Sequence, residues 1–129
     1  MAKVVSFSLN KEAVNLLSEL EKKLGFKNRS ELVRSGLQGL LHEFKDLSNL
    51  AEKVEAIIAV VHSQDHESEV SELTHEFAGV ISTQVHQNLK ERCLDLFVVQ
   101  GSKTTVTEFF LSLKKNKGVL YVKLIPLTP

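Results

Sequence analysis

The single cysteine of the chain, Cys93, is the side chain with the widest range of possible chemistry. Because there is no second cysteine, it cannot form a disulfide within the chain. Three roles remain for it: a packed thiol, a reactive thiol or a metal ligand. Its neighbours Arg92 and Leu94 suit a small buried side chain as well as they suit a ligand. The rest of the sequence has to decide between these roles.

Two of the five histidines, His62 and His66, lie near the acidic start of an expected helix, which contains Asp65, Glu67 and Glu69. We therefore expect His62 and His66 to be solvated surface residues. The sequence has no glycine-rich phosphate loop with an arginine, no nucleophile motif and no paired acids at a useful spacing. An enzyme with a split βαβ fold would be expected to carry one of these features. We expect that the protein is not an enzyme.

The N-terminal segment alternates apolar and polar side chains, with Val5, Phe7 and Leu9 on one face and Ser6 and Ser8 on the other. This period of two predicts a half-buried β-strand. A lone strand leaves its backbone donors and acceptors unpaired, and the first 50 residues contain no second strand pattern. We therefore expect a second copy of the chain to supply the partner strand, which gives a dimeric antiparallel β-ribbon.

Two helices are expected after this strand. The first is capped by Asn10 and stopped by Gly25, and the second is capped by Asn28 or Ser30. Their apolar stripes are Ala13, Leu16, Leu17, Leu20 and Leu24 in the first helix, and Leu32 or Val33, Leu37, Leu40, Leu41 and Phe44 in the second. The pattern predicts a strand-helix-helix domain over residues 1–48.

The pattern changes after a polar stretch from Lys45 to Lys53, which we interpret as a linker or a frayed helix end. The runs that follow are Val54 to Val61 (apolar), Glu67 to Phe77 (amphipathic), Val80 to His86 and Cys93 to Val99 (β-rich), Val106 to Lys115 (helical) and Val119 to Leu127 (β-rich). The order β-α-β-β-α-β is the split βαβ pattern, an antiparallel sheet with two helices on one face. We therefore expect an α+β chain whose second domain spans residues 53–129.

The composition, 43% hydrophobic and 25% charged residues, is that of a folded protein. Apolar runs such as Ile57 to Val61 are far too short to cross a membrane, and the N-terminus shows no signal-peptide pattern. We expect a cytoplasmic protein without a membrane partner. The net charge is zero, but residues 1–45 hold eight basic and five acidic side chains, a local charge of +3 that leaves −3 for the remainder. The cationic part is therefore the strand-helix-helix segment.

The first 45 residues resemble the ribbon-helix-helix family of transcription regulators, in the segments from Val5 to Leu9 and from Gly25 to Glu31. The whole chain resembles the nickel-responsive branch of this family, in which the ribbon is followed by an ACT-like βαββαβ domain. The resemblance implies a transcription repressor that binds a double-stranded DNA operator. It also implies a homotetramer, in which two ribbon dimers flank the ACT-like domains.

A two-stranded ribbon fits the DNA major groove, where side chains on its outward face reach the base edges. The free backbone N–H groups at the start of the second helix suit a phosphate. The expected DNA-contacting residues are Lys3, Val4, Ser6 and Ser8 on the ribbon and Lys27, Asn28, Arg29 and Ser30 at the helix start. Family members often carry a long polar residue at the position of Val4. An interpretation as a dimerisation arm, or as an antitoxin, accounts less well for these residues and for the folded second half.

The resemblance also implies a metal site. Its ligands in the family correspond here to His75 from a neighbouring subunit, to His86 and to Cys93, but the position of a third imidazole holds Asn88. The segment from His86 to Cys93 is also one residue shorter than the usual family pattern. Three imidazoles and a thiolate suit planar nickel or copper(II), whereas an amide oxygen is a poor ligand for such ions. We expect weakened nickel binding. The alternatives are zinc, copper(I) or cobalt as the ion, His62 or His66 as a substitute ligand, or a site that has lost its metal altogether.

These observations predict a DNA-binding transcription regulator that responds to a transition metal through an altered site. The alternative is a regulator of the same class whose ACT-like domain senses a small organic ligand such as an amino acid. Metal titration against amino-acid titration separates the two.

Overall fold

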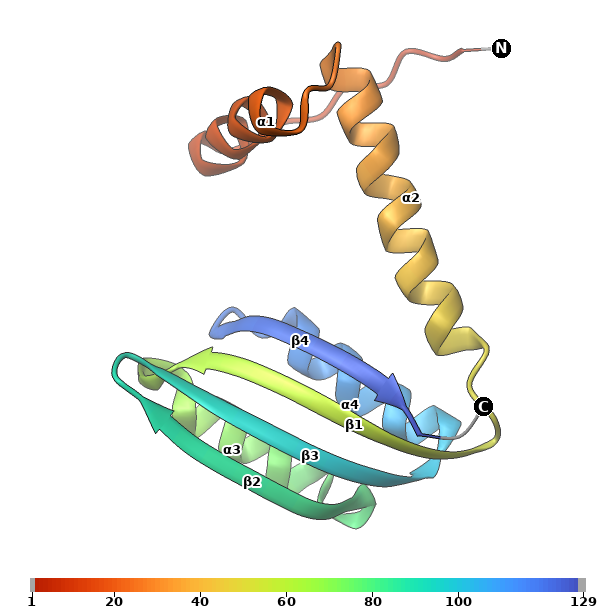
Figure 1. The fold of residues 1–129 in the computed structure, drawn as a ribbon, viewed down its shortest axis with the longest axis vertical. Coiled ribbons are helices and arrows are strands. Elements are labelled where there is room, and N and C mark those ends of the chain that lie inside the picture. Colours follow the sequence, from red (N-terminus) through yellow and green to blue (C-terminus); the bar gives the residue numbers. More distant parts are fainter. Residues whose placement is uncertain (1, 128–129) are drawn as a thin grey trace. The chain divides into compact units, whose positions relative to one another are not determined.

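The computed structural model describes residues 2–127, so that Met1 and the end of the expected second domain, residues 128–129, lie outside the described part. The chain divides into two compact units, Met1–Asp46 and Leu47–Pro129, and each is described by itself. The first unit contains helices, and the second is a four-stranded sheet with two helices (Figure 1).

The first unit consists of α1 (Lys11–Leu24) and the main part of α2 (Arg29–Ser48). The side chain of Asn10 caps α1 by accepting a hydrogen bond from the Ala13 N–H at 2.8 Å, and Gly25 ends the helix with a φ of +71°. The side chain of Asn28 caps α2, where it accepts from the Glu31 N–H at 2.9 Å. Of the two capping residues expected for α2, the structure therefore uses Asn28.

The helix α2 continues to Ser48, so that the polar stretch from Lys45 to Lys53 begins as the end of a helix, which is one of the two interpretations given for it. The segment that precedes α1 has no regular secondary structure in the single chain. The side chains of Val5, Phe7 and Leu9 are exposed there, Phe7 to 76%. The expected ribbon needs a strand from a second chain, and it stays a prediction.

The second unit has the expected β-α-β-β-α-β order. Its elements are β1 (Lys53–Ser63), α3 (Glu67–Glu76), β2 (Ile81–Leu89), β3 (Arg92–Ser102), α4 (Lys103–Lys115) and β4 (Val119–Pro126), with short 3₁₀ turns at Gln64–His66 and Ala78–Val80. The strands form one antiparallel sheet in the order β2-β3-β1-β4, and α3 and α4 lie on the same face of it (Figure 1). The α+β class and the ACT-like topology are confirmed.

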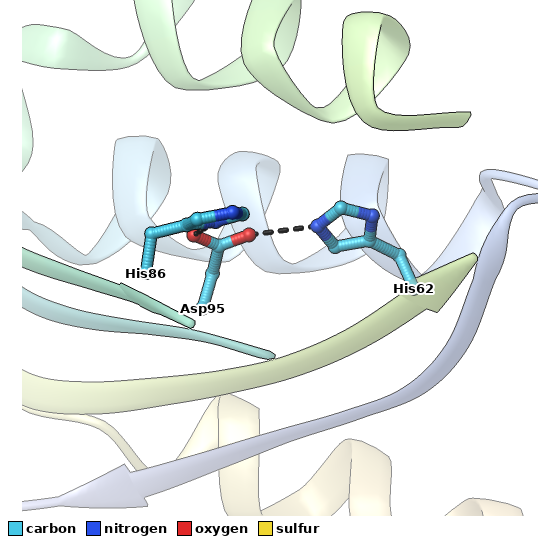
Figure 2. A group of neighbouring side chains, drawn as sticks. All are labelled: His62, His86 and Asp95. Carbon is cyan, nitrogen blue, oxygen red and sulfur yellow. Dashed lines mark hydrogen bonds and ion pairs between the residues drawn. The ribbon is translucent and has the colours of Figure 1, made fainter. Parts of the chain in front are cut away.

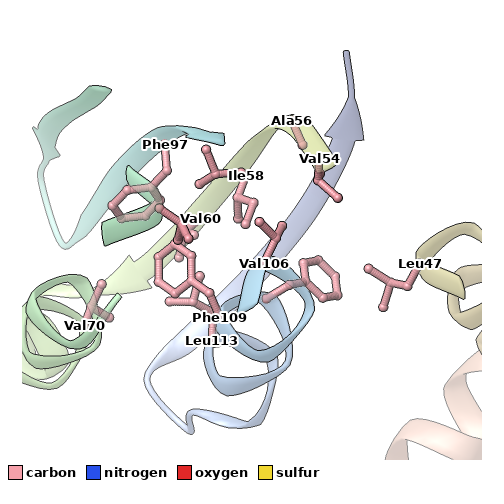
Figure 3. Close-up of a cluster of buried hydrophobic side chains, with 13 residues drawn as sticks. Leu47, Val54, Ala56, Ile58, Val60, Val70, Phe97, Val106, Phe109 and Leu113 are labelled. Atoms are coloured by element: carbon pink, nitrogen blue, oxygen red, sulfur yellow. The ribbon is translucent and has the colours of Figure 1, made fainter. Parts of the chain in front are cut away.

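Alternation along the two central strands builds the core of this unit (Figure 3). The buried side chains of β1 are Val54, Ala56, Ile58 and Val60, and those of β3 include Phe97 and Val99. The rings of Phe77 and Phe97 both pack on Phe109 of α4, with centroid distances of 5.1 and 5.3 Å. The same buried face turns polar at one end of the sheet, where the alternation reaches His62, Cys93 and Asp95.

Candidate metal centre

The sheet register brings the chemistry-bearing residues of three strands together. On the β2–β3 hairpin His86 lies opposite Asp95 and Asn88 lies opposite Cys93, and on the other side of β3 His62 lies opposite Cys93. Cys93 and Asp95 have the same parity along β3 as the buried core residues Phe97 and Val99, so they point to the face that the helices cover. The two-residue turn at positions 90–91 fixes this pairing.

Asp95 lies between two imidazole rings (Figure 2). Its Oδ2 is 2.8 Å from Nε2 of His62, and its Oδ1 is 2.8 Å from Nδ1 of His86. The amide of Gln84 also donates to Oδ1, at 3.1 Å. The carboxylate is 2% exposed and His62 is fully buried, so these contacts replace the water that the carboxylate has lost. Asp95 therefore fixes the orientation of the His86 ring and leaves its Nε2 free to face the other way.

The Nε2 atom of His86 faces Asn88 and Cys93. The Asn88 Oδ1 atom lies 3.2 Å from this nitrogen and accepts from the Cys93 thiol, also at 3.2 Å. The hydrogen bond to Asp95 raises the pKa of His86, and burial raises the pKa of the Cys93 thiol, to which the charges of Glu67 and Asp95 add. In this form of the site the amide oxygen of Asn88 joins the imidazole to the thiol.

Helix α3 closes the site from above. Residues of α3 and of the sheet line a pocket of about 210 Å³: His62, Glu67, Val70, Ser71, Thr74, His75, Gln84, His86 and Asp95. Glu67 Oε1 is 3.5 Å from Nε2 of His86. His75 is exposed, and its Nδ1 donates to the Ser71 carbonyl at 2.8 Å, which leaves Nε2 available. The pocket thus opens beside His86 and carries a second imidazole, that of His75, on its helical wall.

The structure brings His86, Asn88 and Cys93 into direct contact, as the sequence predicted for one side of the site. It places His75 in the same pocket, but outside the two clusters of metal-binding donors found among residues 2–127, which are His62–His86–Asp95 and Glu67–His86–Cys93. A ligand role for His75 stays a proposal.

The expectation that His62 and His66 are solvated is wrong. His62 is fully buried against Asp95, because it continues the inward parity of Val60. The ring of His66 is half-buried: its Nδ1 lies 2.7 Å from the Ser63 hydroxyl, and it packs on Gly118, where an added Cβ would lie 2.1 Å from the His66 Cβ. The sequence interpretation also missed Asp95, although its i, i+2 spacing from Cys93 places both side chains on one face of a strand.

The residues expected to contact DNA lie on the surface of the first unit. The side chains of Lys3, Val4, Ser6, Ser8, Lys27, Asn28, Arg29 and Ser30 are all exposed. The guanidinium of Arg29 lies against α1, 3.3 Å from the Ser18 hydroxyl and 4.0 Å from a carboxylate oxygen of Glu21. Lys27 carries no such contact in the hydrogen bonds and ion pairs of residues 2–127, and it is the freer cation of the two.

Comparison with known proteins identifies the family. The model of the NikR C-terminal nickel-binding domain matches residues 56–126, which is more than half of the chain. The chain belongs to the NikR family. This is a family of regulators and not of enzymes, in agreement with the expectation from the sequence.

Relatives of this NikR-family chain are similar over nearly its whole length. A candidate nickel-responsive regulator of Halobacterium salinarum is 28% identical over 92% of this chain and 87% of its own length. One of Methanocella arvoryzae is 26% identical over 97% of this chain and 92% of its own length. A solved structure of an uncharacterized Thermotoga maritima protein superposes with a TM-score of 0.55 at 25% identity, covering 59% of this chain and 99% of that protein. The last match concerns the second unit's fold.

The donors of this NikR-family site fit a transition metal ion, but not the planar arrangement of three imidazoles and a thiolate. His86 Nε2 and Cys93 Sγ could supply a nitrogen and a sulfur ligand, since both face Asn88, and Asp95 binds the other nitrogen of the imidazole. The place of a third imidazole holds the amide of Asn88. None of the helices within residues 2–127 is long and apolar enough to span a membrane.

Proposed function

We propose that this NikR-family protein is a sequence-specific DNA-binding transcription regulator, a repressor, whose second domain responds to a transition metal. The observation that carries the proposal is that a ring nitrogen of His86 and Sγ of Cys93 lie within 4.8 Å of each other on the β2–β3 hairpin, with Asp95 bound to the far side of the imidazole. Metal-binding histidines nearly always donate their second N–H to such a partner, which fixes the ring and its tautomer. We assign residues 1–48 to DNA binding and residues 53–129 to metal sensing and tetramerisation.

We assign His86, Cys93 and His75 to the metal, with Asn88 in the position of a missing ligand. Nickel is the ion that the family name suggests, whereas zinc and copper suit the thiolate together with fewer imidazoles. An ion at this site would take the place of the hydrogen bonds that Asn88 makes to His86 and Cys93. A bound metal would link the hairpin to its other ligands, and the chain's own residues hold His86 and Cys93 in position.

The first unit supports a dimeric reader. Its apolar side chains Val5, Phe7 and Leu9, and also Leu37 and Phe44 of α2, are between 51% and 76% exposed in the single chain. Exposed apolar area on this scale stabilises association, because each large apolar side chain gains about 1.5–3 kcal/mol on burial. A ribbon formed from two such segments would present Lys3, Val4, Ser6 and Ser8 of each chain to the major groove.

Metal-dependent operator binding tests this function. The full-length, untagged protein is used to select sequences from random double-stranded DNA, with nickel, zinc or a chelator present. We expect one enriched operator whose affinity rises about tenfold or more with the activating metal, since coupling of this kind is typically 1–3 kcal/mol. Identical selections with metal and with chelator would contradict metal sensing, and no enrichment under any condition would contradict sequence-specific DNA binding.

Variants of the reader should separate base contacts from phosphate contacts. Changing Ser6 or Ser8 to alanine should alter which sequences are selected, because these side chains face the bases. Changing Lys27 to alanine should weaken binding to all sequences alike and reduce the slope of log affinity against log salt by about one. Lys117→Ala, which makes the same change of charge on an exposed site of the other unit, is the control. An unchanged preference in both serine variants would remove the N-terminal segment from the reader role.

A second candidate function rests on the pocket beside His86. With Glu67, Ser71, Thr74 and Gln84 on its walls as well as imidazoles, it offers both donors and acceptors to a small zwitterion such as an amino acid. If nickel, zinc and copper leave the selections unchanged while an amino acid changes them, the protein is an organic-ligand sensor of the same class.

A further inference from the structure

Glu67 is the strongest ligand group near the position that Asn88 leaves without an imidazole. One carboxylate oxygen of Glu67, one ring nitrogen of His86 and Sγ of Cys93 all lie within 4.8 Å of one another. Oε1 of Glu67 lies 3.5 Å from Nε2 of His86. This is the ring nitrogen that faces Asn88 and Cys93. An oxygen, a nitrogen and a sulfur atom of one chain therefore lie close to one common position.

The backbone places Glu67 there. It is the first residue of α3, directly after the 3₁₀ turn Gln64–His66. The Gln64 N–H donates to the Glu91 carbonyl at 3.3 Å, and the Gln64 side chain donates to the Leu89 carbonyl at 3.4 Å. The start of α3 is thus tied to the turn of the hairpin that carries Asn88 and Cys93. A carboxylate at this helix position stays near the hairpin without needing a second subunit.

The charges also indicate a cation at this position. With Cys93 ionised, Glu67 and the thiolate are two anions beside Asp95, and without a cation they repel one another. The carboxylate of Glu67 lies within 4.8 Å of both the His86 ring nitrogen and the Cys93 sulfur, so the two anionic groups are close neighbours. A divalent ion bound to one carboxylate and one thiolate is formally neutral, and a neutral site is favoured where water is partly excluded.

We propose that Glu67 is a metal ligand that replaces the missing imidazole, so that Glu67, His86 and Cys93 bind one divalent ion within a single chain. Nitrogen, sulfur and oxygen ligands around an ion with one open position are typical of tetrahedral zinc and cobalt(II) rather than planar nickel. The fourth position remains for His75 or for water. This inference rests on the proposed function, because it names a ligand and a class of ion for the same site.

Cobalt(II) titration of the reduced full-length protein tests the assignment, because cobalt(II) reports thiolate coordination and geometry in its absorption spectrum. We expect the wild type to show a thiolate-to-cobalt band and the intense visible bands of a four-coordinate ion. Glu67→Gln should keep the thiolate band, lose about tenfold or more in affinity, since even outer-shell partners contribute about 10–100-fold, and shift the visible bands. Glu69→Gln, on the same helix and also exposed, is the matched control and should behave as the wild type.

The outcomes separate the inference from the proposed function. Cobalt binding with a thiolate band but with equal affinity and spectra in Glu67→Gln and wild type would overturn the Glu67 assignment and leave metal sensing standing. An absence of cobalt and zinc binding by the wild type would overturn the Glu67 assignment, and an absence of nickel and copper binding as well would also overturn the proposed function. Glu67 is exposed, so circular dichroism of Glu67→Gln should match the wild type, and the loss of affinity is then a property of the site.

Discussion

Cys93→Ser should abolish metal binding while leaving the fold intact. The loss of an outer-shell partner alone costs about 10–100-fold in metal affinity, so removal of the thiolate ligand should cost about 100-fold or more. Serine has the same shape but does not ionise near neutral pH, so it cannot supply the anionic ligand. Titrations of reduced protein with zinc, cobalt(II) and nickel, followed by competition with a chelator, measure the change.

The control for Cys93→Ser is the secondary structure and the thermal unfolding of the metal-free protein. Cys93 is buried but small, and its sulfur contacts the Asn88 amide, which a hydroxyl can also reach. Metal-free stability should therefore change little. Retained tight binding of zinc in the variant would show that the ion lies elsewhere, and tight nickel binding by the wild type with the absorbance of a planar thiolate complex would show that Asn88 is no handicap.

The same titrations should depend on pH in a defined direction. The pKa of the Cys93 thiol is raised above its ordinary value of 9.0, mainly by burial, and the pKa of His86 is raised above 6.5, mainly by Asp95. Both shifts favour the protonated form of the group, and a metal that binds to the imidazole and the thiolate has to displace these protons. Affinity in the wild type should therefore rise with pH and protons should be released on binding. Cys93→Ser should remove most of this dependence.

Asp95→Asn is expected to have the second large effect, on stability and on metal affinity together. Asp95 accepts a ring N–H on each of its oxygens, from His62 and from His86, whereas asparagine offers one oxygen and one amino group. One imidazole then faces a donor instead of an acceptor inside the protein. We expect a loss of about 2–4 kcal/mol of unfolding free energy in the metal-free protein, measured by chemical denaturation. Metal affinity should fall about 10–100-fold, because His86 loses its orienting partner.

The pH dependence distinguishes this role of Asp95 from simple packing. Because the pKa of His86 is raised in the folded protein, its contribution to stability is complete below the ordinary value of 6.5 and is lost as the pH rises through the raised value. In Asp95→Asn this loss should be smaller, and the pKa of His86 measured by NMR should fall. Asp46→Asn, which removes an exposed carboxylate, is the control. An unchanged His86 titration in Asp95→Asn would contradict the pairing.

The fold of the second unit could be predicted from the sequence because apolar, amphipathic and β-rich runs follow one another there in a recognisable order. The run from Val54 to Val61 alternates in the structure as a strand with one buried face, and the helical stretch ending at Lys115 forms α4. The N-terminal segment shows the limit of this reasoning. Its alternation predicts a strand, but the partner for that strand would have to come from a second chain, and the single chain leaves Val5 and Phe7 exposed.

The site was predicted in part. His86, Asn88 and Cys93 share a hairpin, so local register was enough to bring them together. Asp95 was missed, and His62 was expected at the surface, because their contact depends on two strands that are distant in sequence. The acidic residues near His62 suggested solvent, although its strand parity with Val60 would have placed it inside. Glu67 lies at the start of a helix, where carboxylates are common because they interact favourably with the helix dipole. Its position in the sequence therefore does not by itself indicate a metal ligand.

The length of the two-residue turn of the β2–β3 hairpin determines which side chains of the candidate site lie opposite one another. The number of residues between Leu89 and Arg92 sets the register of the hairpin, that is, which residue of β2 lies opposite which residue of β3. Adding one residue to the turn, with no ligand altered, would offset the two strands by one position, so that Asn88 would no longer lie opposite Cys93. Restoring an imidazole at position 88 by substitution alone would therefore not recreate a site evolved around a longer turn. The length of this turn is therefore as much a part of the hairpin's geometry as the identity of the side chains on it.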